Sequence, residues 1–341
     1  SRIQSGELCY LLNEESDGDE VIWRQNLPGL TPIDAHPVLD ATHAIVHKDD
    51  TGYYFNDTGG IVPDERTDTF TIATPDELMD FATLVNQGSM KVSAILTADI
   101  DLSRYKGTLT LPIGTVHSPF KGTFDGDGHT IHHLIIDRPT NGYVGLFGVV
   151  GGGACIKNVV LDDDCRLHGQ AYVGLIGAVN DRGHLSIENV GNEGEVISET
   201  INAGGILGCN MGSLATVSMT NCYVTGPVNG SSESAALSGW IGSGATIKGC
   251  YSLTDVEGVS ENDYLFRGEA TVSNCYDLYG ANGAKKTSVR EAASGQLCYY
   301  LNTRGEEPID IWRQNLPGLS PVDSHPLLDR SRGRAGGRAH V

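Results

Sequence analysis

The stretch Gly142-Tyr143-Val144-Gly145-Leu146-Phe147-Gly148 decides the fold, because similar blocks recur along the chain. Each block is short, consists mainly of small and apolar residues, and closes with a glycine. The closing glycines are 29, 31, 34 and 26 residues apart. A period of about 30 residues without helical spacing indicates the stacked coils of a solenoid. The four later blocks span 171–177, 202–208, 236–242 and 262–268.

A strand-like segment follows each block. Residues 155–161 and 185–190 alternate apolar and polar side chains, as a strand with one buried face does. Equivalent residues of stacked coils lie roughly 4.8 Å apart, so one asparagine per coil would form a ladder of paired amides. We therefore predict an all-β fold, a right-handed parallel β-helix over 91–290, since right-handed crossovers are the strong default. The expected ladder contains Asn158, Asn189, Asn221 and Asn274, with Gly249 interrupting it.

A short helix is predicted to cap the first coil, within a linker region over 57–90. Thr74-Pro75-Asp76-Glu77 contains an N-cap residue, a proline at the first helical position and a capping-box glutamate. Apolar residues then recur at helical spacing and Gly88 ends the segment, which places the helix at about 75–86. Its apolar face would cover the first coil and protect an otherwise unpaired strand edge. The residues of that face are Leu78, Phe81, Ala82 and Val85.

The charge of the chain limits its partners. The 341 residues carry a formal net charge of −20, which argues against nucleic acid or an anionic membrane as a partner. No apolar run approaches the ~18 residues of a transmembrane helix. The N-terminal residues Ser1-Arg2-Ile3-Gln4 do not begin a signal peptide, although this says little about a fragment of a longer protein.

The eight cysteines include three that each precede a tyrosine at one coil position: Cys222, Cys250 and Cys275. Buried thiols that behave as small hydrophobic groups are the favoured interpretation. A disulfide between adjacent coils is the alternative, and it would leave one of the three unpaired. No histidine accompanies them at metal-ligand spacing.

A longer repeat indicates that the chain is a piece of a larger protein. Residues 5–40 and 294–329 agree at 22 of 36 positions. The second copy follows a β-helix, so residues 1–56 are predicted to be the end module of a preceding, missing repeat array. Residues 291–329 are then the second copy of this small β module. Residues 330–341 resemble no earlier part of the sequence and are interpreted as a vector-derived tail, with a natural basic tail as the alternative.

The aromatic residues of the two modules are candidate ligand-binding residues. Trp23, Trp312 and Tyr299 could form a platform on which a sugar ring stacks. The alternative is that they pack the module against the last coil, because a solenoid also needs a C-terminal cap.

Two of the blocks and an earlier segment resemble a known family. Residues 142–148 and 172–177 resemble GLUG repeats, and Phe120 to Ile131 resembles the phrase that opens the first coils in that family. The modules look like those that follow such arrays in surface proteins of gut-type anaerobic bacteria. The resemblance covers roughly 70–329 and implies a right-handed β-helix, secretion or surface display, and adhesion or glycan contact. It implies no defined catalytic residues.

An enzyme is the alternative function, since parallel β-helices often carry polysaccharide hydrolases and lyases. Glycoside hydrolysis needs two carboxylates, about 5 Å apart for retention and about 6.5–9.5 Å for inversion. The catalytic candidates are Asp125, Asp127, Asp163 and Glu188. The structural alternative for Asp125 and Asp127 is a turn whose residues are selected for backbone conformation. The alternative for Asp163 is a solvent-exposed corner of the coil.

Calcium is the one cofactor that the sequence suggests, because hard oxygen ligands gather at turns. The candidate ligands are Asp125, Asp127, Asp162 and Asp164, without EF-hand spacing.

Three histidines near one turn, with Arg138, could supply a base and an anion clamp for a lyase. Strand alternation places His129 and His132 on opposite faces, so we do not expect His129, His132 and His133 to converge. The favoured hypothesis is a secreted or cell-surface module for adhesion or glycan binding. The alternative is a carbohydrate-active enzyme that uses acidic residues on one face of the β-helix.

Overall fold

The structure is a computed structural model that describes most of the predicted β-helix. The predicted tail over 330–341 and most of the first module lie outside the described residues. The described residues are 7–14, 23, 25, 37, 45–49, 52–57, 63–64, 69–105, 112–211, 215–257 and 264–329.

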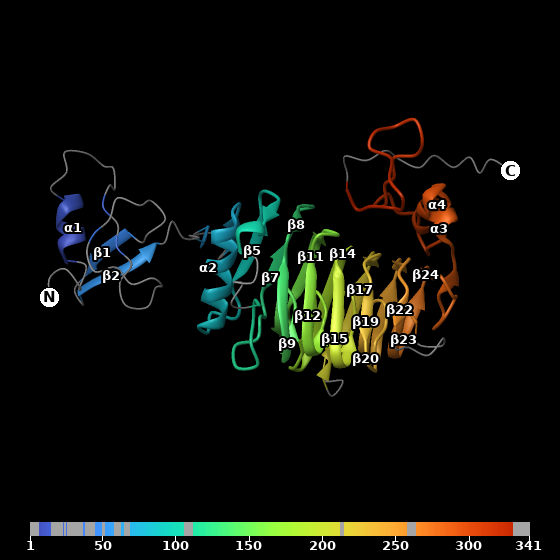
Figure 1. The fold of residues 1–341 in the computed structure, drawn as a ribbon, viewed down its shortest axis with the longest axis horizontal. Coiled ribbons are helices and arrows are strands. Elements are labelled where there is room, and N and C mark those ends of the chain that lie inside the picture. The colour runs from blue at the N-terminus through green and yellow to red at the C-terminus, as the bar shows by residue number, and fades with distance from the viewer. Residues whose placement is uncertain are drawn as a thin grey trace.

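The described chain folds mainly as a solenoid of parallel strands (Figure 1), so the predicted parallel β-helix is confirmed. One face is a five-stranded sheet in which each strand comes from a successive coil. Its strands are β9 (Ile135–Val144), β12 (Arg166–Val173), β15 (Glu195–Ala203), β19 (Val228–Gly230) and β22 (Val256–Glu257).

The other faces belong to one continuous 18-stranded sheet. Its first stack contains β10 (Phe147–Val150), β13 (Ile176–Val179), β16 (Leu207–Asn210), β20 (Ser238–Lys248) and β23 (Phe266–Ser273). A second stack contains β4 (Thr69–Ile72), β5 (Ser93–Leu96), β7 (Thr123–Asp125), β11 (Cys155–Leu161), β14 (Gly183–Asn192) and β17 (Ala215–Thr220), and continues into β20. Short strands pair around the next corner: β6 (Ile100–Asp101), β8 (Thr130–His132), β18 (Tyr223–Val224), β21 (Tyr251–Ser252), β24 (Tyr276–Asp277) and β25 (Lys285–Lys286).

The glycines of the repeated blocks stack directly on one another. A Cβ atom on Gly174 would lie 2.4 Å from the carbonyl oxygen of Gly204, so no larger residue fits at that approach.

Leu207 pairs with Ser238, which makes Gly239 the equivalent of Gly208 in the next coil. The prediction that Gly242 closes the fourth block was therefore wrong. Sequence spacing alone did not reveal the correct register in this coil.

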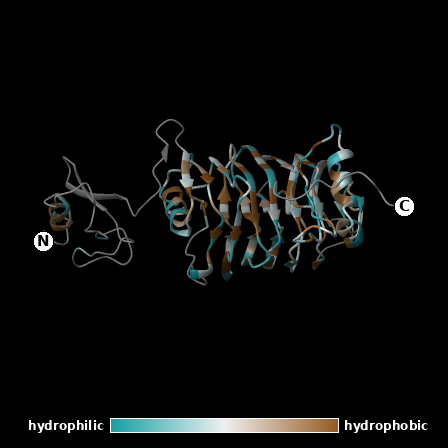
Figure 2. Cartoon of the chain, turned by 90° about the horizontal axis from the view of Figure 1, so that it is seen from above, coloured by the Kyte–Doolittle hydropathy of each residue, from teal (hydrophilic) through white to brown (hydrophobic). Residues whose placement is uncertain are grey.

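The core is a set of rows with one side chain per coil. Phe124, Ile156, Ile187, Met219 and Ile247 occupy one register position, and each is 0% exposed. Burying a side chain of this size stabilises the fold by roughly 1.5–3 kcal/mol. Figure 2 shows hydrophobic and hydrophilic residues interleaved along the solenoid, as strands with one buried face require.

The predicted capping helix is confirmed as α2 (Pro75–Asn86). The Glu77 amide donates to Thr74 Oγ1 at 3.3 Å, and the Thr74 amide donates to Glu77 Oε2 at 2.9 Å, which completes the capping box. Asn86 then holds the next segment through Pro112 and Gly114. The four predicted apolar residues are all buried against the first coil: Leu78, Phe81, Ala82 and Val85.

The predicted asparagine ladder is confirmed over three coils. Asn189 donates to Asn158 Oδ1 at 2.8 Å, and Asn221 donates to Asn189 Oδ1 at 3.1 Å. Asn274 donates instead to the Leu301 carbonyl at 2.9 Å. All four asparagines have φ between 50° and 56°, and Gly249 has φ 65°. Each coil thus turns through a left-handed residue, and asparagine and glycine are the types that tolerate this conformation.

The cysteines are free in the structure, as predicted. The Cys222 amide donates to Cys250 Sγ at 3.3 Å, and the Cys250 amide donates to Cys275 Sγ at 3.4 Å. Burial raises the pKa of the Cys250 and Cys275 thiols well above the ordinary value, which keeps both protonated.

The flanking regions differ from the predicted β modules. The second module starts with two helices, α3 (Val289–Ala293) and α4 (Gln296–Thr303), and α1 (Glu7–Glu14) occupies the position equivalent to α4 in the first copy. An Asn–Trp pair recurs after both helices: Asn13 donates to the Trp23 carbonyl and Asn302 to the Trp312 carbonyl. The remaining elements are β1 (Ile45–Asp49), β2 (Gly52–Asp57), β3 (Pro63–Asp64) and η1 (Ser103–Tyr105).

We predict that Asn189→Ala lowers the free energy of unfolding by about 3 kcal/mol. Two amide hydrogen bonds are worth about 1 kcal/mol each, and alanine in a left-handed position costs about 1–2 kcal/mol. Asn189→Gly keeps the backbone conformation and should lose clearly less stability than alanine. Urea unfolding of both variants measures the difference. A glycine variant as unstable as the alanine variant would show that the left-handed corner is not the constraint.

Candidate functional site

The second module folds back along one row of the solenoid. Tyr223, Tyr251 and Tyr276 occupy one register position in successive coils, and the rings of Tyr223 and Tyr251 stack at 5.4 Å. The Trp312 ring lies 5.2 Å from Tyr251 and 6.0 Å from Tyr223, and Trp312 is 0% exposed. Tyr251 Oη also lies 3.0 Å from His325 Nδ1. The tyrosine row is therefore the surface on which the module packs.

A groove forms where the tyrosine row ends. The same register position carries Thr130, Val160 and Gly191 in the preceding coils, and a Cβ atom on Gly191 would lie 2.3 Å from the Tyr223 ring. Residues 310–329 of the second module extend beyond Tyr223 over these earlier coils. The smaller side chains there leave a space of about 870 Å³ beneath the module. We call this space the acidic groove. It is lined by Asp99, Asp127, Gly128, His129, Thr130, His132, Asn158, Val160, Asp162, Asn189, Glu193, Tyr223, Asp310, Ile311, Val322, Asp323, Ser324, His325, Leu327, Leu328 and Asp329.

Negative charge dominates this lining. Seven of the lining residues are Asp or Glu and three are His, and none of the described residues that line the groove is Lys or Arg. Five aliphatic side chains complete the walls: Val160, Ile311, Val322, Leu327 and Leu328. The groove therefore combines hydrogen-bond acceptors with apolar patches.

Glu193 is the most strongly enclosed carboxylate of the groove for which a pKa shift is resolved. It accepts a short hydrogen bond from Tyr223 Oη, and its Oε2 lies 3.9 Å from His325 Nε2. Burial raises the pKa of Glu193, and this outweighs the attraction of His325 and the Tyr223 hydrogen bond, which lower it. The charges of Asp162 and Asp163 raise the pKa further. A carboxyl group with this balance holds its proton to higher pH than an exposed glutamate.

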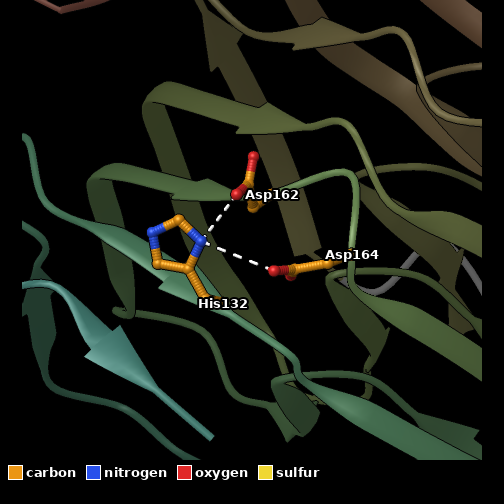
Figure 3. A group of neighbouring side chains, drawn as sticks. All are labelled: His132, Asp162 and Asp164. Atoms are coloured by element: carbon orange, nitrogen blue, oxygen red, sulfur yellow. Dashed lines mark ion pairs between the residues drawn. The ribbon is translucent and has the colours of Figure 1, made fainter. Parts of the chain in front are cut away.

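Histidine–aspartate pairs also contribute to the groove. His132 Nδ1 lies 2.6 Å from Asp162 Oδ2 and 3.6 Å from Asp164 Oδ2 (Figure 3). His129 Nδ1 lies 3.1 Å from Asp99 Oδ1. Burial acts to raise the pKa of Asp99, but hydrogen bonds from the Thr130 amide and from His129 outweigh it and lower the pKa.

The histidine prediction was partly wrong. His129 and His132 both line the groove, although strand alternation placed them on opposite faces. The reason is that β8 begins at Thr130, so His129 lies in the preceding turn, where alternation does not apply. His133 pairs with Asp101 at 2.9 Å and is not among the lining residues. Arg138 lies on β9 and does not line the groove, so the predicted anion clamp is not assembled there.

The four catalytic candidates are scattered. Asp127 is exposed and lines the groove, whereas Asp163 and Glu188 are exposed and lie outside its lining. Asp125 Oδ1 accepts from Asn158 and from the Asp127 amide, both at 2.9 Å, and its Oδ2 lies 2.9 Å from Lys157 Nζ. Burial acts to raise the pKa of Asp125, but these contacts lower it overall. Asp125 is thus an ionised end of the asparagine ladder and is unsuited to donating a proton.

The four predicted calcium ligands do not come together as one set. Among the described residues, the group of metal-ligating side chains whose ligand atoms all lie within 4.8 Å of one another contains His132, Asp162 and Asp164. Asp125 and Asp127 are not part of it.

The predicted aromatic platform is not formed by the second module. Trp312 is fully buried, so its indole offers no face to a sugar, and the packing alternative describes it correctly. Tyr299 is 41% exposed on α4 but does not line the groove. Trp23 is half-buried.

Several groove residues were not among the predicted site residues, and they include Glu193, His325 and Asp99. The duplicated His-Pro step at 36–37 and 325–326 was the available signal for His325. Glu193 gave none, because its environment depends on a module more than 100 residues later in the chain.

Comparisons with known proteins define the fold but not a family. No protein-family model matches the chain. A protein of Evansella cellulosilytica, provisionally named a Gly-rich membrane protein, is 34% identical over 101 residues, which are 29% of this chain and 12% of that protein. Halomucin of Haloquadratum walsbyi is 28% identical over 180 residues, which are 51% of this chain and 2% of halomucin. The chain therefore spans only a small part of the length of either relative.

A solved structure shares the fold. The crystal structure of a protein from Bacteroides ovatus, provisionally described as an immunoglobulin A1 protease, superimposes with a TM-score of 0.51 at 17% identity. The match covers 76% of this chain and 92% of that one. No helix within the described residues has the length and apolar character needed to span a membrane.

We predict that Glu193→Gln stabilises the protein increasingly as pH rises. A carboxyl group whose pKa is raised on folding contributes stability at low pH, and this contribution is lost as pH rises through the folded-state pKa. Glutamine keeps an acceptor for Tyr223 without the charge, so the variant should match the wild type near pH 4 and exceed it near pH 8. Thermal unfolding at several pH values measures this, with exposed Glu188→Gln as the charge-matched control. A constant difference across pH would contradict the raised pKa.

Proposed function

We propose that this chain is part of a secreted or cell-surface β-solenoid protein, and that the acidic groove binds an uncharged glycan. The observation that carries the proposal is the groove itself, which places carboxylates next to aliphatic side chains. Sugar hydroxyls donate to carboxylates in strong, charge-assisted hydrogen bonds, and the C–H faces of a sugar ring pack on apolar groups.

The charge of the groove favours an uncharged ligand. A polyanion would have to place its own charges beside seven acidic residues without a neighbouring Lys or Arg in the described lining. Like charges in a partly desolvated site are costly. Polyuronates and sulfated glycans are therefore disfavoured.

The relatives support a surface location. One relative is named a Gly-rich membrane protein and the other is named halomucin. The resemblance of 142–148 and 172–177 to GLUG repeats also supports surface display and adhesion. In this proposal the solenoid is the support that holds the groove at a fixed position in a longer protein.

We predict that Val160→Tyr weakens glycan binding at least about tenfold, which corresponds to about 1.4 kcal/mol. Tyrosine at this register position extends the existing tyrosine row into the groove and fills it. Asp127→Asn, which removes one lining carboxylate, should weaken binding less. The measurement is a glycan array followed by calorimetry with the retained polysaccharides.

The matched control is Glu188→Gln, which removes an exposed charge outside the groove. It should bind as the wild type does. Preferential binding of polyuronates, or unchanged binding by Val160→Tyr, would contradict the assignment of the groove.

A glycoside hydrolase is a second candidate function, favoured by the environment of Glu193. Its pKa is raised by burial, as a general acid requires, and Asp162 lines the same groove as a second carboxylate.

If this candidate is correct, polysaccharides incubated with the protein should show new reducing ends, and Glu193→Gln should abolish them. Loss of at least about 100-fold is expected for removal of a general acid. Glu188→Gln, which removes an exposed charge outside the groove, should leave the rate unchanged. Binding without new chain ends would reject the enzyme and leave the glycan-binding proposal standing.

A further inference from the structure

We propose that His132, Asp162 and Asp164 bind a divalent transition-metal ion such as Zn²⁺ at the wall of the acidic groove. One nitrogen and carboxylate oxygens from both aspartates lie within 4.8 Å of one another. Figure 3 shows the imidazole directed between the two carboxylates, which come from the neighbouring coil. This inference is independent of glycan binding, because the ion is held by protein ligands alone.

The three ligands are positioned by the backbone of two adjacent coils. His132 is the last residue of β8, which pairs with β6 on one side and β11 on the other. The Asp162 amide donates to the Ile131 carbonyl at 3.1 Å, and the Cys165 amide donates to the Asp162 carbonyl at 3.0 Å. These bonds fix the turn that carries both aspartates, so a bound ion would cross-link two coils.

A further contact orients Asp164. Its Oδ1 accepts from the His133 amide at 2.6 Å, and its Oδ2 lies 3.6 Å from His132 Nδ1. Hydrogen bonds of this kind to the ligands are a general feature of metal sites, where they hold the ligating atom in place.

The distances suit a small ion with little rearrangement. Zn²⁺ binds nitrogen and oxygen at about 2.0–2.2 Å, so tetrahedral ligand atoms lie about 3.3–3.6 Å apart. The His132–Asp164 separation of 3.6 Å already meets this requirement. The His132–Asp162 separation of 2.6 Å is that of a hydrogen bond, and it must widen by about 1 Å or less when the metal replaces the shared proton.

The ligand types select the class of ion. Calcium takes six to eight oxygen ligands, whereas this cluster offers an imidazole nitrogen and two carboxylates. Imidazole with carboxylates suits zinc and its neighbours among the transition metals. Three protein ligands leave at least one coordination position for water or another group.

The electrostatics of the groove give separate support for a cation. Asp162 belongs to a lining with seven acidic residues, and no described lining residue is Lys or Arg. His132, Asp162 and Asp164 are each about one-third exposed or less, so water screens their charges only in part. A divalent cation would relieve the repulsion among these groups.

The test is a titration of the chelator-treated full chain with Zn²⁺ in competition with a chromophoric chelator, together with the visible spectrum of the Co²⁺ form. We expect one ion whose binding is weakened at least about 100-fold by His132→Ala, since loss of a ligand should exceed the 10–100-fold typical of changes to residues that hydrogen-bond to a ligand. Asp162→Asn should act in the same direction. Intense Co²⁺ absorption bands of a low-coordinate site should disappear with the same variants.

The matched control is His184→Ala, an exposed histidine on β14 whose ring contacts Thr216 and Ser218. It should retain the ion, and far-ultraviolet circular dichroism shows whether each variant keeps its fold. The proposal is overturned if His132→Ala binds as tightly as the wild type, if His184→Ala loses the same ion, or if Ca²⁺ displaces Zn²⁺ at equal concentration.

Discussion

The structure depends on one backbone constraint, a left-handed residue at the same corner of successive coils. Asn158, Asn189, Asn221 and Asn274 meet this constraint, and Gly249 meets it without a side chain. Because a one-residue slip in a strand turns every side chain to the other face, a fixed corner also fixes which residues enter the core. The amide ladder adds hydrogen bonds between coils at the point where the backbone conformation is least favourable. Conformation and register are thus set by the same few residues.

The corner also determines where a ligand site can form. The position two residues after the left-handed corner residue carries tyrosine in the last three coils. In two earlier coils it carries Val160 and Gly191. The tyrosines bind the second module through Trp312, and the smaller residues leave the acidic groove beneath the same module. The packing surface and the proposed binding site therefore lie along one row of the solenoid, and a change of side-chain size along this row separates the two.

The parts of the fold that arise from local or periodic signals could be predicted from the sequence. The capping helix is encoded within twelve residues, and the ladder repeats once per coil, so both were recognised. The register of the fourth block was missed because Gly239 and Gly242 lie only three residues apart, and strand pairing is what distinguishes them. The groove was missed for a different reason. It requires residues 310–329 to fold back over coils that begin near residue 99, and no local pattern reports that path. His132, Asp162 and Asp164 were all considered, but as members of two separate sets.

The concentration of carboxylates around the groove must be stabilised within the fold, and the structure does this in three ways. Asp125 is neutralised by Lys157 and hydrogen-bonded by Asn158, the aspartates at 99 and 162 face imidazoles, and burial raises the pKa of Glu193. None of these contacts brings Lys or Arg into the described lining, so the groove keeps a negative field. Two like charges 4 Å apart repel by about 1 kcal/mol in water and about 4 kcal/mol near a protein surface. An anionic ligand would meet this repulsion several times over, whereas a hydroxyl-rich ligand or a cation would not. The ligand classes that we propose for the groove therefore follow from how the fold compensates its own charge.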